Sequence, residues 1–136
     1  MELIDEITNS ILAQFEDRLD HDTAQKLAVS ALIINDTKGD ISKDVNLDIP
    51  SMTKLNGDTG IYVQYTAVRM RSLINKLFEG SALGRESAEF TVMDLEYLSN
   101  EQKHILFLSS LLPQKTKTAL EMTKPHVLTQ YLLEMT

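Results

Sequence analysis

The side chains best suited to binding chemistry lie in one segment, residues 57–76. Aromatic, hydroxyl and cationic residues recur there at intervals of three and four: Tyr62, Tyr65, Arg69, Ser72 and Lys76. A helix would place this polar stripe on one face. Aromatic rings beside Arg and Lys can stack on nucleobases and hold phosphates. The same pattern also occurs where Tyr and Arg side chains pack between helices, with their stems buried and their polar ends in water. The polar stripe therefore predicts contact with RNA or with another helix.

The same helix carries a second, apolar stripe at core spacing: Val63, Ala67, Met70, Ile74 and Leu77. This apolar stripe predicts a face buried in a hydrophobic core. Gly57 and Gly60 flank an Asp-Thr pair and predict a turn before the helix begins.

No other group of residues predicts catalysis. The three histidines, His21, His104 and His126, have no partner at metal-ligand spacing on the same helix face. Ser51 and Lys54 match the Ser-x-x-Lys pattern of some acyl-transfer enzymes, but the accompanying Ser-Asp-Asn motif is missing. The sequence therefore predicts no nucleophile and base pair, no metal site and no phosphate-binding loop.

The overall charge argues against a non-specific nucleic-acid binder. The net charge is −7 over 136 residues, and phosphate contact needs clustered cations. The charge is uneven, however, because residues 61–78 contain Arg69, Arg71 and Lys76 and no acid. The chain has no cysteine, no membrane-length apolar run and no basic leader, so a cytoplasmic protein is expected.

The chain is predicted to be all-α, with mostly antiparallel helices joined by short connections. Helices are predicted over residues 2–17, 23–35, 50–55 and 59–79, and from Ser99, Pro113 and Pro125. A connector is predicted over residues 36–50, and a loop is predicted over residues 80–93. Asp22 or Thr23 is expected to cap the second helix, and Ser99 with Gln102 forms a capping box.

The last helical pattern runs to Thr136 without a stop signal. A truncated chain is therefore expected, with an apolar face left open at its C-terminal end. Such a face predicts possible self-association.

Three segments together resemble arginyl-tRNA synthetases. The first keeps the family's Thr59-Gly60 and Tyr62-Val63-Gln64-Tyr65, with Ile61 where the family has Pro. It also keeps Arg69 and Ser72, with Ala67 in place of His. Residues 29–36 resemble the family's Val-Gly-Ala stretch, with Ser30 in place of Gly. Residues 112–132 resemble the Phe-Pro…Ala…Glu-Pro-His-x-Leu-x-x-Tyr-Leu pattern of its anticodon-binding domain.

The resemblance implies that residues 1–60 are the tail of a class I catalytic domain. Residues 61–136 would then form most of the helical anticodon-binding (DALR) domain, incomplete at its C-terminus. The full enzyme would join arginine to tRNA(Arg) using ATP and Mg²⁺. Its His-Ile-Gly-His and Lys-Met-Ser-Lys-Ser signatures are absent here and would precede residue 1. The resemblance thus implies no cofactor site in this segment and no aminoacylation by it alone.

By the same resemblance, nine residues are expected to contact tRNA: Tyr62, Gln64, Tyr65, Arg69, Arg71, Lys76, His126, Gln130 and Tyr131. Alternatively, Tyr65 and Arg69 brace the junction with the catalytic domain. A further alternative is a degenerate stand-alone helical module that binds a protein and has neither RNA-binding nor ligase function.

Overall fold

The computed structural model describes residues 2–16, 18–78 and 96–136, and regular secondary structure in these ranges is helical. The helices are α1 (Glu2–Gln14), α2 (His21–Thr37), α3 (Ile49–Met52), α4 (Gly60–Phe78), α5 (Asn100–Ser110), α6 (Leu112–Met122) and α7 (His126–Glu134). Each predicted helix has a counterpart, which confirms the all-α class. The predicted loop over 80–93 lies outside the described residues.

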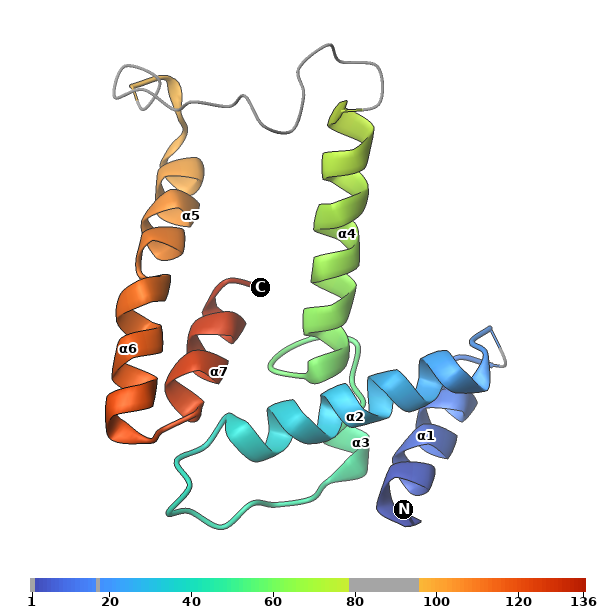
Figure 1. The fold of residues 1–136 in the computed structure, drawn as a ribbon. Helices are drawn as coiled ribbons and strands as arrows, with labels where there is room; N and C mark the ends of the chain where they lie inside the picture. The colour runs from blue at the N-terminus through green and yellow to red at the C-terminus, as the bar shows by residue number, and fades with distance from the viewer. Residues whose placement is uncertain (1, 17, 79–95) are drawn as a thin grey trace.

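The first four helices share one hydrophobic core around α2. In Figure 1, α2 crosses the base of the molecule, α1 packs beside it and α4 rises from it. The buried core residues come from all four helices: Ile7, Ile11, Ala24, Ala28, Ala31, Met52 and Ile61. The three alanines follow helical spacing along α2 and are small enough for close approach of the neighbouring helices. This core positions the start of α4.

The C-terminal helices form a second group. In Figure 1, α5 and α6 follow one another in a column, and α7 turns back beside α6. The predicted capping box is confirmed, because Ser99 Oγ accepts from the Gln102 N–H and the Gln102 side chain accepts from the Ser99 N–H. Pro113 lies in the first turn of α6, and Pro125 directly precedes α7.

The prediction that Asp22 or Thr23 caps α2 was wrong. Asp20 caps the helix, and its carboxylate accepts from the Thr23 N–H at 2.9 Å and from the Thr23 hydroxyl at 2.7 Å. With Asp20 as the capping residue, the helix begins at His21, so Asp22 and Thr23 lie inside its first turn.

The predicted core face of α4 is only partly confirmed. Val63 is half-buried, but Ala67 is exposed, and Met70 and Ile74 are 48% and 47% exposed. The helix packs on α2 through its first turns, where Gly60 and Ile61 are buried, so the later turns of the apolar stripe face outward. None of the described helices is both long and apolar enough to cross a membrane.

Candidate nucleic-acid interface

A tight turn positions the start of α4. The Thr59 hydroxyl is buried and donates to the Lys54 carbonyl at 2.8 Å. The same oxygen accepts from the Tyr62 N–H at 3.2 Å, so Thr59 satisfies one of the free donors of the first helical turn. Gly57 has φ +76, a left-handed conformation that favours glycine. The Thr-Gly segment thus sets where the polar stripe begins.

Gly60 lies directly against the backbone of α2. A Cβ atom at Gly60 would lie 2.2 Å from the Ser30 carbonyl oxygen. The Ser30 hydroxyl donates to the Gly60 carbonyl at 3.2 Å and accepts from the Gln64 Nε2 at 3.4 Å. In the sequence, Ser30 stands out only as a departure from the family pattern. This contact could not be predicted, because nothing in the sequence pairs residues thirty positions apart.

Three residues of the polar stripe form a stacked array. The Tyr62 and Tyr65 ring centroids are 6.4 Å apart with an interplanar angle of 32°. The Arg69 guanidinium carbon lies 5.5 Å from the Tyr65 ring centroid, within cation–π range. The Tyr65 residue is 53% exposed. The array therefore offers an accessible ring and an adjacent planar cation, which is the chemistry that holds an unpaired nucleotide.

The other α4 residues predicted to bind are exposed but do not all share this face. Lys76 follows Arg69 by seven residues and so continues the polar stripe. Arg71 follows Gln64 by seven residues, on a different side of the helix. The structure thus brings Tyr62, Tyr65 and Arg69 together and separates Arg71 from them.

The three predicted residues of α7 are engaged within the protein. Tyr131 is 8% exposed, and its hydroxyl donates to the Leu108 carbonyl at 2.8 Å. The Gln130 Nε2 donates to the Lys38 carbonyl at 3.2 Å, and the His126 Nε2 lies 3.8 Å from the Asp40 Oδ2. The buried Tyr131 ring cannot stack on a base. The contacts of α7 therefore hold the helices of this chain together.

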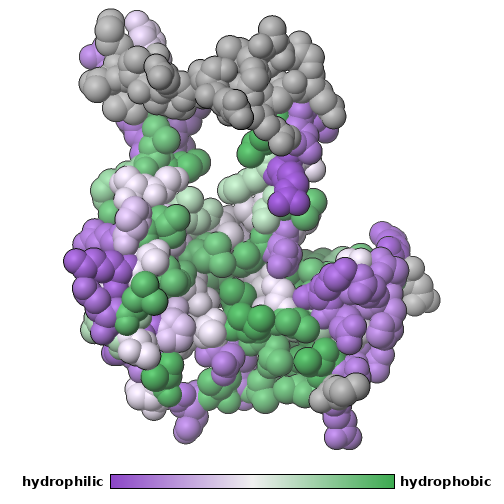
Figure 2. Space-filling view, viewed as in Figure 1, coloured by the Kyte–Doolittle hydropathy of each residue, from purple (hydrophilic) through white to green (hydrophobic). Residues whose placement is uncertain are grey.

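An apolar groove of about 900 Å³ runs beside the stacked array. Tyr65 and Gln64 lie on its α4 side. Phe15 and Leu19, from the turn between α1 and α2, and Leu27 of α2 contribute its apolar wall. Figure 2 shows apolar residues gathered over the lower middle of the visible face, with hydrophilic residues on either side. The polar stripe therefore lies between water and an apolar surface.

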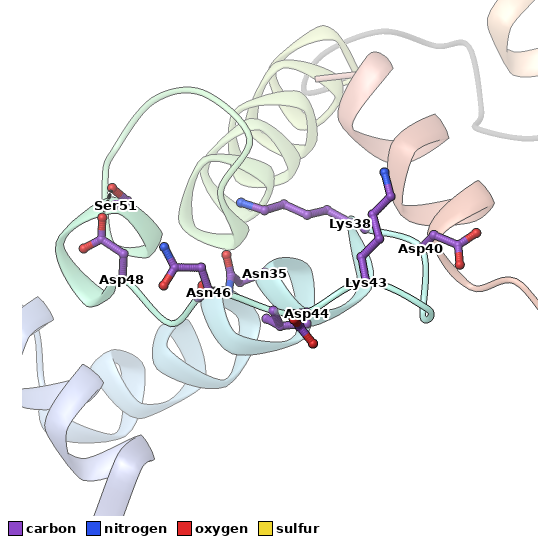
Figure 3. A pocket seen from close by; sticks show the side chains of 10 residues that line it. Asn35, Lys38, Asp40, Lys43, Asp44, Asn46, Asp48 and Ser51 are labelled. Atoms are coloured by element: carbon purple, nitrogen blue, oxygen red, sulfur yellow. Dashed lines mark hydrogen bonds between the residues drawn. The ribbon is translucent and has the colours of Figure 1, made fainter.

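A smaller polar pocket of about 300 Å³ lies in the connector between α2 and α3. Figure 3 shows Lys38 and Lys43 pointing to one side of the loop, while the Asp44 carboxylate points away from them. The Ser42 N–H and hydroxyl and the Lys124 ammonium all donate to Asp40, which lowers the pKa of that carboxyl below its ordinary value. In the described part of the chain, no cluster of three or more metal-ligating side chains is present.

Comparison with known proteins identifies relatives along almost the whole chain. No family model matches it. It is 30% identical to the arginine–tRNA ligase of Exiguobacterium sp. over 115 residues, covering 84% of this chain and 19% of that protein. It is 28% identical to the arginine–tRNA ligase of Clostridium beijerinckii over 131 residues, covering 96% of this chain and 21% of that protein.

The fold agrees with the sequence comparison. The structure of Thermus thermophilus arginyl-tRNA synthetase matches with a TM-score of 0.78 at 26% identity, covering 98% of this chain and 22% of that one. The chain thus spans about a fifth of the length of the relatives that it matches.

Proposed function

Because the chain is similar to arginine–tRNA ligases along almost its whole length, we propose that it is a segment of an arginine–tRNA ligase. Residues 1–60 would be the tail of the catalytic domain and residues 61–136 most of the helical anticodon-binding domain. The match of 98% of the chain to one continuous fold supports this assignment above all else. Ile61 packs with the core residues of α1–α3, so the first turn of α4 would join the two parts.

In the whole enzyme, arginine, ATP and Mg²⁺ would be bound outside this segment. The described residues do not fit a Mg²⁺ site, because they hold no cluster of three or more candidate ligands. ATP with Mg²⁺ would supply the activation of arginine when bound in the rest of the enzyme. We expect no arginine-dependent ATP–pyrophosphate exchange by this chain alone.

The contribution of this segment would be contact with tRNA(Arg) along α4. An unstacked base would lie on the exposed Tyr65 ring, and Arg69 and Lys76 would contact phosphates, with Tyr62 supporting the array. Gln64 and Arg71 would lie on the flank of this surface. His126, Gln130 and Tyr131 would act through their contacts to α2 and α5.

The alternative function, a stand-alone protein-binding module, is less favoured. Identity to arginine–tRNA ligases extends over 84% and 96% of the chain in the two relatives, as a synthetase segment requires. The net charge of −7 would favour the module, but residues 61–78 carry three cations and no acid.

Binding of a tRNA(Arg) transcript by the chain, measured by fluorescence anisotropy over a salt series, tests the proposal. We expect Arg69→Ala to weaken binding and to reduce the slope of log affinity against log salt by about one. Tyr65→Ala should lose about 1–3 kcal/mol of binding free energy, and Tyr65→Phe should keep most of it.

Lys103→Ala is the matched control, because Lys103 is an exposed cation on α5, outside the polar stripe. It should bind as the unmodified chain does. Binding that responds equally to Lys103→Ala and Arg69→Ala, or no binding at low salt, would contradict an RNA surface on α4.

A further inference from the structure

The two groups of helices have separate apolar interiors. The core cluster of α1–α4 contains no residue of α5–α7. The buried apolar residues of the C-terminal helices are Leu108, Ala119 and Tyr131, and the Tyr131 hydroxyl bonds α7 to α5. The described residues therefore form two packed units, α1–α4 and α5–α7.

A set of polar contacts joins the units where the end of α2 meets the start of α7. The Thr129 hydroxyl donates to the Thr37 hydroxyl at 2.9 Å, and the Lys124 Nζ donates to the Asp40 Oδ2 at 3.0 Å. The Gln130 Nε2 donates to the Lys38 carbonyl at 3.2 Å, and the His126 Nε2 lies 3.8 Å from the Asp40 Oδ2. We call this set the clasp: Thr37, Lys38 and Asp40 with Lys124, His126, Thr129 and Gln130.

Local structure holds both sides of the clasp in place. The Ser42 N–H and hydroxyl donate to the Asp40 Oδ1 at 3.0 and 2.8 Å, which orients the carboxylate. On the other side, Thr123 adopts a left-handed conformation with φ 54, and the Lys124 N–H bonds to the Ala119 carbonyl at 2.9 Å. These bonds end α6 with a fixed turn and aim Lys124 at Asp40.

The ionic contact of the clasp is partly open to water, whereas Thr129 is buried. The Lys124 and Asp40 side chains are 37% and 23% exposed, so salt weakens their attraction. The His126 Nδ1 is buried with no hydrogen-bond partner, and opening the contact would return it to water.

We propose that the clasp is a releasable joint that sets the orientation of α5–α7 against α1–α4 and opens without unfolding either unit. This inference does not depend on RNA binding. The contacts of α7 would then serve to orient the two units of the segment.

The test uses the full chain, with Lys124→Ala and Thr129→Val combined to remove the ionic contact and the hydroxyl pair. Lys117→Ala with Thr118→Val makes the same changes on the α6 surface, away from the clasp, and is the matched control. We expect the clasp variant to lose nuclear Overhauser contacts between residues 37 and 129 and to show a larger radius of gyration by X-ray scattering. Its circular dichroism should equal that of the control.

Retention of the 37–129 contacts in the clasp variant would overturn the proposal. So would a loss of helix content in step with the loss of these contacts, since the two units would then unfold as one.

A crosslink provides a second, independent arm. The chain has no cysteine, so Thr37→Cys with Thr129→Cys creates a single possible disulfide. We expect it to form in a glutathione buffer, measured by mass as the loss of two hydrogens, and to restore the compact radius when Lys124→Ala is added. Failure to oxidise, or no recovery of the radius, would contradict the joint.

Discussion

Gly60 allows the backbones of α2 and α4 to touch at the point where the polar stripe begins. Any side chain there would enter the space of the Ser30 peptide, which belongs to a helix and cannot rotate away. The family-like Thr-Gly sequence therefore has a packing reason in this molecule, independent of any ligand.

We expect Gly60→Ala to destabilise the chain by roughly 1–3 kcal/mol or more through overpacking. Urea unfolding monitored by circular dichroism measures this loss. Gly39→Ala is the control, because a Cβ atom at Gly39 meets nothing within 4 Å. Equal stability of the two variants would show that α4 can move away from Ser30 without cost.

For individual side chains, the sequence predicted the polar array better than its surroundings. Helical spacing brought Tyr62, Tyr65 and Arg69 together as expected, because local periodicity alone determines which residues share a face. The contact of Ser30 with Gly60 and the bond of the Tyr131 hydroxyl to Leu108 depend on how distant helices pack together. The pattern within one helix does not show which residues of another helix it will contact, so neither was predicted.

Among the helices, α4 and α5 show what can be predicted from a local signal. The start of α5 was predicted because its two capping bonds lie within four residues. The apolar stripe of α4 was correctly assigned to one face, yet Met70 and Ile74 are about half exposed. Periodicity defines a face but does not define what covers it.

Loss of the α5 cap should loosen that helix. We expect Ser99→Ala to cost about 0.5–2 kcal/mol, because the Gln102 N–H loses its acceptor. Hydrogen exchange of the first α5 amides measures the effect. Ser109→Ala is the control, since the Ser109 hydroxyl only bonds back to the Ile105 carbonyl of its own helix. Equally fast exchange in both variants would contradict a role for the cap.

For the whole molecule, the clasp links the charge of the connector to the placement of α7. The pKa of Asp40 is lowered below its ordinary value of 3.8 by its Ser42 and Lys124 donors. A lowered folded-state pKa means that the ionised carboxylate stabilises the folded chain fully above pH 3.8. This stabilisation is lost as the pH falls from 3.8 through the lowered pKa.

We therefore expect contacts between residues 37 and 129 to persist from pH 7 to about 4 and to weaken only below that range. Nuclear Overhauser contacts across a pH series measure this, with circular dichroism to report unfolding. Asp40→Asn should weaken the contacts already at pH 7, whereas Asp44→Asn on the exposed connector should not. Contacts in Asp40→Asn that match the parent at pH 7 would contradict the assignment to Asp40.

The close approach of Gly60 to Ser30 also has a mechanical consequence. At about 1.5 Å per residue, the 19 residues of α4 extend about 28 Å from this contact. A helix anchored by its first turns acts as a lever arm, so a tilt of about 10° at Gly60 displaces its far end by about 5 Å. The positions of Arg69 and Lys76 therefore depend on how Gly60, which has no side chain, packs against Ser30.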